Sequence, residues 1–141
     1  MPKYLLDTCA WIDAILSPEL LSPKVRKIIE QASPIHLATF SVLELARKEA
    51  LGKIILKMPC EEWLETVALP PGKIKLLPMT PSIAIDSTRL PGAFLNKQGQ
   101  PHKDPADRVI TATARHHGLT LLTSDQILLD YSHVPTLKSR K

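Results

Sequence analysis

Short apolar runs alternate along this chain with longer segments whose apolar residues recur every three or four positions. The short runs predict β-strands and the periodic segments predict α-helices. We predict strands at Lys3–Leu6, Ile35–Ala38, Ile74–Leu77, Leu119–Leu122 and, at an edge of the sheet, Val134–Leu137. We predict helices at Thr8–Leu16, from Pro23 to a stop at Pro34, and at Phe40–Leu51, Pro59–Leu69, Pro81–Leu90, Asp104–His117 and Gln126–Leu129. This alternation predicts an α/β fold, a three-layer α/β/α sandwich around a central, mainly parallel sheet.

Three segments interrupt the periodic pattern. Pro70-Pro71-Gly72 is expected to break the helix before it. Pro91–Lys103 forms a 13-residue loop without periodicity, and loops of that length inside a compact domain are often functional. The basic tail, Lys138–Lys141, is expected to be frayed.

Composition narrows the class of protein. A length of 141 residues with 44% hydrophobic side chains is enough for one compact domain with its own core. No apolar run reaches the roughly 18 residues of a membrane span, and the N-terminal run is too short for a signal peptide. Cys9 and Cys60 form neither a metal-binding pair nor a disulfide framework, and we expect Cys9 to be a small buried side chain. The sequence predicts a cytoplasmic protein.

Four carboxylates follow the predicted strands. Asp7 comes directly after the first strand, and Asp125 comes shortly after the strand that ends at Leu122. Glu44 lies one turn into the helix after the second strand, and Asp107 lies in the first turn of the helix after the long loop. Because sites in parallel sheets form beyond the carboxyl ends of the strands, we expect these four side chains to meet at one edge of the sheet.

Each carboxylate alone also has a structural interpretation. Asp7 fits the N-cap of the helix that follows it, and Asp125 or Ser124 fits the same role further along the chain. Asp104 fits an N-cap before Pro105, which would place Asp107 at the positive end of a helix dipole. Glu44 is harder to explain in this way, because it is flanked by leucines and a lone buried carboxylate is costly.

Together the four acids predict a metal site. Clustered carboxylates raise one another's pKa, and a bound cation relieves the repulsion. The candidate ligand atoms are all oxygens, with the hydroxyl groups of Thr8, Thr123 and Ser124 as neighbours. Such a set suits Mg²⁺ or Mn²⁺ rather than Zn²⁺, and the number of ions stays open. A site of this kind is typical of enzymes that hydrolyse phosphodiesters.

The charge distribution favours a polyanionic substrate. The formal net charge is +4, and without the four acids only ten acidic residues stand against 18 basic ones. Basic residues lie close in sequence to the acids: Arg47, Lys48, Lys97, Lys103 and Arg108. They are candidates for binding RNA phosphates around an acidic centre, and the alternative is that they are ordinary solvated charges.

The stretches "LLDTCAWI", "SVLELARK" and "KDPADRVITATARHHGLTLLTSD" resemble the PIN domain, and within it the VapC toxins of bacterial and archaeal toxin–antitoxin pairs. The likeness covers essentially the whole chain, and its most specific part runs from Lys103 to Asp125. It implies a Mg²⁺- or Mn²⁺-dependent endoribonuclease on a three-layer sandwich. In that family, the catalytic and metal-binding acids correspond to these four residues: Asp7, Glu44, Asp107 and Asp125.

The resemblance also implies supporting residues and partners. Thr123 and Ser124 match the polar pair before the family's last aspartate, and Asp104 matches a frequent extra acid that supports the site or caps the helix. Members of the family form homodimers and pair with a small, VapB-like antitoxin whose C-terminal segment covers the active site.

Two other functions stay open on the sequence: an RNA-processing PIN nuclease without an antitoxin, and a catalytically silent module that binds RNA or an antitoxin. A phosphatase or phosphoacceptor domain is disfavoured, because Leu6 and Cys9 stand where such proteins carry a second acid. His102, in the long loop, is a candidate for RNA contact. Trp11 and Trp63 are expected in the core or at an interface.

Overall fold

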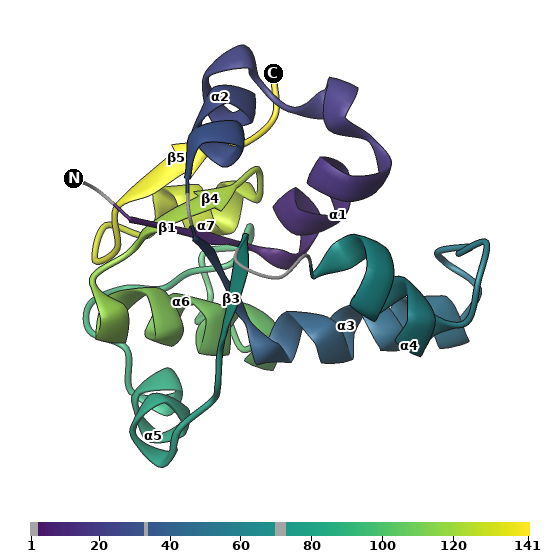
Figure 1. Cartoon of the computed structure of the whole chain (residues 1–141). Coiled ribbons are helices and arrows are strands. Elements are labelled where there is room, and N and C mark those ends of the chain that lie inside the picture. The colour runs from purple at the N-terminus through teal and green to yellow at the C-terminus, as the bar shows by residue number, and fades with distance from the viewer. Residues whose placement is uncertain (1–2, 33, 70–72) are drawn as a thin grey trace.

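A five-stranded sheet forms the centre of the protein in the computed structural model, which describes residues 3–32, 34–69 and 73–141 (Figure 1). All four pairings are parallel, and the strand order is β3-β2-β1-β4-β5. The strands are β1 (Tyr4–Leu6), β2 (Ile35–Ala38), β3 (Ile74–Leu77), β4 (Thr120–Thr123) and β5 (Thr136–Lys138). The predicted parallel sheet is confirmed, with β5 as the predicted edge strand.

Helices pack on both faces of the sheet, and the predicted three-layer sandwich is confirmed (Figure 1). The helices are α1 (Thr8–Leu16), α2 (Pro23–Gln31), α3 (Thr39–Ala50), α4 (Cys60–Trp63), α5 (Pro81–Thr88), α6 (Pro105–His117) and α7 (Gln126–Asp130), with a 3₁₀ turn η1 (Pro18–Leu20). The predicted helix Pro59–Leu69 consists of α4 and a π-helical turn η2 (Leu64–Ala68). The predicted break at Pro70-Pro71-Gly72 lies outside the described residues. Among the described helices, none has the length and apolar character needed to cross a membrane.

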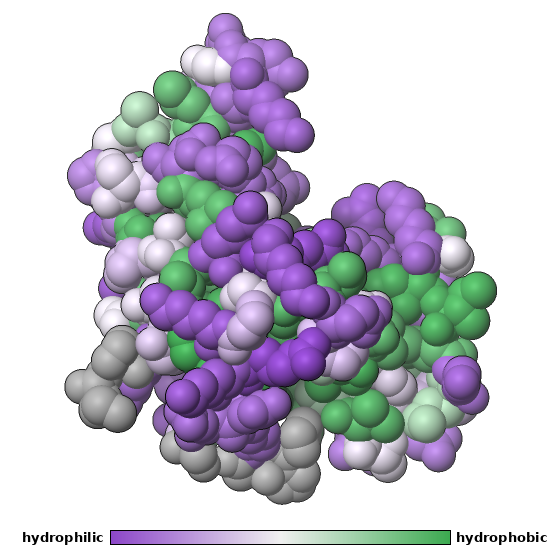
Figure 2. Space-filling view, turned by 90° about the horizontal axis from the view of Figure 1, so that it is seen from above, coloured by the Kyte–Doolittle hydropathy of each residue, from purple (hydrophilic) through white to green (hydrophobic). Residues whose placement is uncertain are grey.

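Several large apolar side chains are exposed on α1, on α3, in the segment that follows α3 and on η2. They are Leu16, Leu43, Leu51, Ile55 and Val67. Figure 2 shows hydrophobic residues gathered on its right-hand side, which is the side where Figure 1 places α1, α3 and α4.

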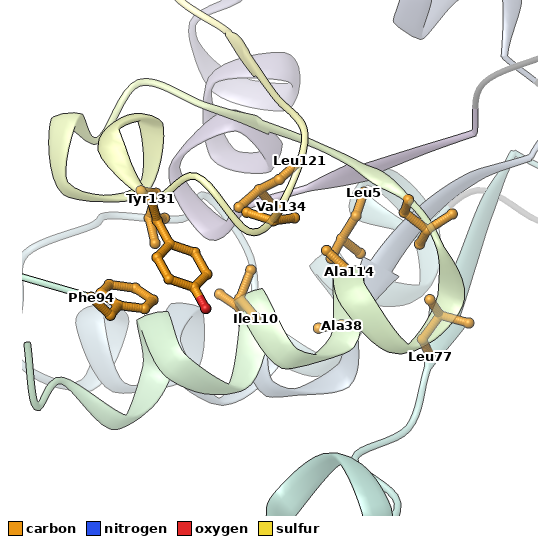
Figure 3. Packing of buried hydrophobic residues seen from close by; sticks show 11 residues of the cluster. Leu5, Ala38, Leu77, Phe94, Ile110, Ala114, Leu121, Tyr131 and Val134 are labelled. Carbon is orange, nitrogen blue, oxygen red and sulfur yellow. The ribbon is translucent and has the colours of Figure 1, made fainter. Parts of the chain in front are cut away.

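The sheet separates two buried cores. Leu5 and Leu121 belong to the core that includes Ile110 of α6 (Figure 3), whereas Leu6 and Leu122 belong to the core on the other face. Successive strand residues point to opposite faces, so burial on both sides requires apolar residues at every position of a central strand. This requirement explains the short continuous apolar runs in the sequence.

The two tryptophans belong to the second core. Trp11 is fully buried and its indole N–H donates to the carbonyl of Ala68 at 3.1 Å. The rings of Trp11 and Trp63 lie 6.1 Å apart between centroids. Both side chains are therefore core residues.

The long loop Pro91–Lys103 contains no helix or strand, as predicted, but it packs against the core and is closed at its tip. Phe94 is buried and stacks on Tyr131, with the ring centroids 4.5 Å apart (Figure 3). Asn96 Oδ1 accepts the backbone N–H groups of Gln98 and Gln100, each at 3.0 Å, which closes the tip of the loop.

The prediction that the C-terminal tail is frayed is wrong. Ser139 is buried, and its backbone N–H donates to the carbonyl of Thr123 at 2.8 Å. The carbonyl of Ser139 accepts the N–H of Ser22 at 2.9 Å, and Arg140 forms an antiparallel bridge with Leu21. The tail therefore continues beyond β5 as a strand-like segment between β4 and the start of α2.

Candidate metal centre

The four predicted carboxylates line one pocket of about 210 Å³. Asp7 follows β1 directly and Asp125 lies just beyond β4, while Glu44 comes from α3 and Asp107 from the first turn of α6. The other walls are formed by Thr8, Cys9, Lys48, Ile110, Ser124 and Arg140. The structure thus brings the four acids together, and their roles in metal binding and catalysis remain predictions.

Asp7 is nearly completely buried, and only neutral groups hydrogen-bond to it. Its Oδ1 accepts the N–H of Ala10 at 2.6 Å, so Asp7 also caps α1, and its Oδ2 accepts the hydroxyl of Thr123. The pKa of Asp7 is raised to about 6, mainly by burial; the charges of Asp125 and Glu44 also raise it, and the two hydrogen bonds lower it. Asp7 is therefore a buried acid whose charge is not balanced by an ion pair with any described residue.

Glu44 is held in the pocket by a contact with α1. The hydroxyl of Thr8 contacts Glu44 Oε1 and lies 2.9 Å from Ser41 Oγ. Glu44 is half-buried, as its leucine neighbours suggested. Of these two neighbours, Leu45 packs fully into the core, whereas Leu43 is 57% exposed. Thr8, buried between the two helices, is thus a supporting residue of the site.

Asp107 lies where a capped helix begins. Asp104 is the N-cap of α6, and its Oδ2 accepts the N–H of Asp107 at 3.1 Å, as the sequence predicted. Asp107 Oδ2 is 2.7 Å from Nε2 of His102 in the long loop. Burial raises the pKa of Asp107, the contact with His102 lowers it, and the charges of Asp104 and Asp125 raise it.

Asp125 is positioned by the same hydroxyl group that contacts Asp7. Thr123 Oγ1 accepts the N–H of Asp125 at 3.1 Å and donates to Asp7, so one side chain orients two acids. Asp125 Oδ1 caps α7 by accepting the N–H of Ile127 at 2.9 Å. Ser124 Oγ lies 2.7 Å from Ser139 Oγ and accepts the N–H of Arg140 at 2.7 Å, which ties the C-terminal tail to the pocket.

The donor set fits a hard divalent cation. Carboxylate oxygens with hydroxyl neighbours are the groups that Mg²⁺ and Mn²⁺ prefer. Among the described residues, the group with three ligand atoms within 4.8 Å of one another is His102, Asp104 and Asp107. That closer group is explained by a histidine–aspartate contact beside a helix cap.

The five predicted RNA-binding residues are placed differently from one another. Lys48 is half-buried and lines the pocket, and Arg47, Lys97 and Lys103 are exposed. The guanidinium of Arg108 donates to the carbonyls of Ser87 at 2.6 Å and His102 at 2.9 Å, and it lies over the ring of Phe94. Arg108 therefore holds the long loop against α5 and α6, and its role in RNA binding stays a prediction.

Two residues make contacts at the site that the sequence analysis did not predict. Arg140 lines the pocket and forms a two-point ion pair with the buried Asp13, at 2.8 and 3.0 Å. His102 was expected at most to contact RNA, yet it contacts Asp107. No local signal distinguished Arg140 from the rest of a basic tail, because its partner lies at the other end of the chain.

The expectation that Cys9 is a small buried side chain is wrong. Cys9 is exposed and lines the pocket next to Asp7. Both cysteines are free thiols, as predicted. The reason for the error is geometric: the side of α1 that carries Cys9 faces the pocket, not the core.

Comparison with known proteins identifies the family. The model of the PIN domain matches residues 4–134, which is nearly the whole chain. The chain belongs to the PIN domain family. A curated relative, Ribonuclease VapC22 of Mycobacterium tuberculosis, is 34% identical over 135 residues, covering 94% of this chain and 95% of the relative.

Solved structures share the PIN fold along the whole length. DNA-bound VapBC from Salmonella typhimurium matches with a TM-score of 0.70 at 19% identity, covering 97% of this chain and 98% of that one. FitAcB from Neisseria gonorrhoeae matches with a TM-score of 0.67 at 22% identity, covering 96% of each chain. These matches confirm the parallel sheet flanked by helices.

Proposed function

We propose that this PIN domain protein is a Mg²⁺- or Mn²⁺-dependent endoribonuclease and the toxin of a toxin–antitoxin pair. The observation that carries the proposal is one pocket lined by four carboxylates from separate segments, with Asp7 buried and without an ion pair to any residue that the structure describes. Two likenesses support it: a 34% identical relative is named a ribonuclease, and the solved structures of the same fold include toxin–antitoxin complexes.

The residues have distinct roles in this proposal. Asp7, Glu44, Asp107 and Asp125 would hold the ion, which when bound supplies activation of water and neutralisation of charge on the phosphodiester. The chain itself fixes the ligands in advance: Thr123 orients Asp7 and Asp125 together, and the contact from α1 orients Glu44.

The wall of the pocket offers cations for the substrate. Lys48 and Arg140 line it beside the four acids, and they would attract the phosphates of an RNA strand. The net positive charge of the chain favours the same kind of substrate.

The proposed partners are a small antitoxin and a second copy of the chain. Exposed apolar side chains on α1, on α3 and after α3 provide surface for such contacts. An antitoxin that covers the pocket would stop cleavage by blocking access to the four acids.

The test compares purified wild type with Asp107→Asn on total RNA, with Mg²⁺, Mn²⁺ or EDTA. Wild type is expected to cleave with either ion and to stop in EDTA. Asp107→Asn should lose about 10²-fold or more of the cleavage rate, because a metal ligand contributes several kcal/mol to such reactions.

The matched control is Asp86→Asn, which removes an exposed aspartate on α5 outside the pocket. This variant should cleave like wild type. Absence of cleavage by wild type with either ion, or equal rates in Asp107→Asn and wild type, would show that the proposed activity is wrong.

A further inference from the structure

A second pocket, of about 230 Å³, adjoins the acidic one. Cys9, Lys48 and Arg140 line both pockets, so the two share a wall. We call the second one the basic pocket; its side chains include three cations and two isoleucines, namely Ile12, Lys48, Lys53, Ile54 and Arg140.

The basic pocket carries a net positive charge. Its single acid, Asp13, is engaged by Arg140 through two hydrogen bonds. Lys48 and Lys53 form no ion pair with any residue that the structure describes. Two lysines thus remain uncompensated directly beside a pocket lined by four carboxylates.

Arg140 is fixed in an orientation that suits an anion. Its Nε and Nη2 donate to Asp13, and this pairing holds the planar guanidinium rigid. The N–H groups of Nη1 have no partner among the described residues, and the side chain is 47% exposed. A rigid guanidinium with unused donors is a good phosphate ligand, because little conformational entropy is lost on binding.

The remaining wall is apolar. Ile12 of α1 and Ile54, after α3, are half-buried and line the same pocket. A ligand with an anionic group and a flat or apolar part would satisfy both kinds of side chain. A nucleotide unit has this composition, with a phosphate for the cations and a nucleoside for the isoleucines.

We propose that the basic pocket binds the nucleotide next to the scissile phosphate of a single RNA strand. This inference rests on the proposed ribonuclease function. RNA carries a phosphate at every unit, so a strand whose phosphate lies at the four acids presents another phosphate to the adjoining cations. Lys53 and Arg140 are then substrate-binding residues of the site, with Asp13 as the positioning residue for Arg140.

The test measures steady-state cleavage of a short single-stranded RNA by Lys53→Gln and by the double variant Lys48→Gln/Lys53→Gln. Lys53→Gln should raise KM by about fivefold with little change in kcat, because it removes a phosphate contact away from the reacting bond. In the double variant, the slope of log(kcat/KM) against log[salt] should become shallower by about 1.4, since each contact with single-stranded RNA contributes about 0.7.

The matched control is Lys75→Gln, which removes an exposed lysine on β3 outside both pockets. It should leave KM and the salt slope close to those of wild type. The inference is wrong if Lys53→Gln behaves like Lys75→Gln, or if Lys53→Gln lowers kcat and leaves KM unchanged.

A binding measurement separates this inference from the proposed activity. Fluorescence anisotropy with labelled RNA in EDTA needs no catalysis, so it reports on the basic pocket even for a protein that does not cleave. Weaker RNA binding by the double variant than by Lys75→Gln supports the pocket. Equal RNA affinities of the two variants overturn it. So does a result in which the double variant binds an acidic peptide more weakly but binds RNA as tightly as Lys75→Gln does.

Discussion

Helix α1 holds two aspartates of nearly equal burial in different ways. Asp7, at its N-cap, is 5% exposed and accepts hydrogen bonds from a hydroxyl and a backbone N–H. Asp13, further along the helix, is 4% exposed and accepts two hydrogen bonds from the guanidinium of Arg140. The first carboxylate has only neutral partners, whereas the second has a permanent cation.

The difference separates an acid with a structural role from an acid that can bind a metal ion. Burial of a carboxylate is unfavourable unless its charge is compensated. Arg140 compensates Asp13 within the fold, so Asp13 has no need of an ion from solution. Asp7 lies among other carboxylates, and its own pKa is raised. A divalent cation is the group that would compensate the charge of Asp7.

The largest expected effect comes from replacing each aspartate by asparagine in the presence of metal. Asp7→Asn should lower cleavage by about 10²- to 10³-fold and abolish the rise in melting temperature that Mg²⁺ is expected to produce in wild type. Asp13→Asn should keep the Mg²⁺-dependent rise, because Asp13 is not a ligand. Thermal unfolding with and without Mg²⁺ measures both, and an equal loss of the rise in the two variants would remove the distinction.

The metal-free protein should show a pH dependence of stability to which Asp7 contributes. Its pKa is raised from 3.8 to about 6 in the folded state, so the folded protein binds the proton more tightly than the unfolded chain does. The stabilisation is therefore complete below about pH 4 and is lost as the pH rises through 6, by at most about 3 kcal/mol.

Urea denaturation in EDTA checks this sign with matched variants. At pH 7, Asp7→Asn should be more stable than wild type, and the gap should close towards pH 4. Asp13→Asn should be less stable than wild type at pH 7, because it loses the pairing with Arg140. A lower stability of Asp7→Asn at pH 7 would contradict the proposed cause.

Local signals in the sequence were sufficient for most of the fold and for the four acids. The structure has the bounds predicted for Thr8–Leu16, Ile35–Ala38 and Ile74–Leu77. Caps and apolar runs determine these elements within a few residues, so no remote contact is needed to find them. The meeting of Asp7 and Asp125 followed from the rule that parallel strands end at one edge of a sheet.

The parts that could not be predicted depend on contacts between remote residues. Arg140 pairs with Asp13 over a separation of 127 residues, and the tail pairs with β4 and the start of α2. A basic C-terminal tetrapeptide has no local pattern that reveals such partners. The exposure of Cys9 has the same origin, since it depends on where other elements leave the pocket open.

The smallest effect concerns the ion pair itself. Arg140→Gln should lower the free energy of unfolding by about 2 kcal/mol, because it leaves Asp13 buried without its cation. The loss should be less than for a fully buried pair, since Arg140 is 47% exposed and solvent already screens its charge.

The double variant Asp13→Asn/Arg140→Gln should recover part of the loss, because no uncompensated charge then remains. Urea denaturation of the two single variants and the double variant gives the coupling energy. Additive losses would mean that the two side chains do not stabilise each other, and the contrast between Asp7 and Asp13 would then have no energetic basis.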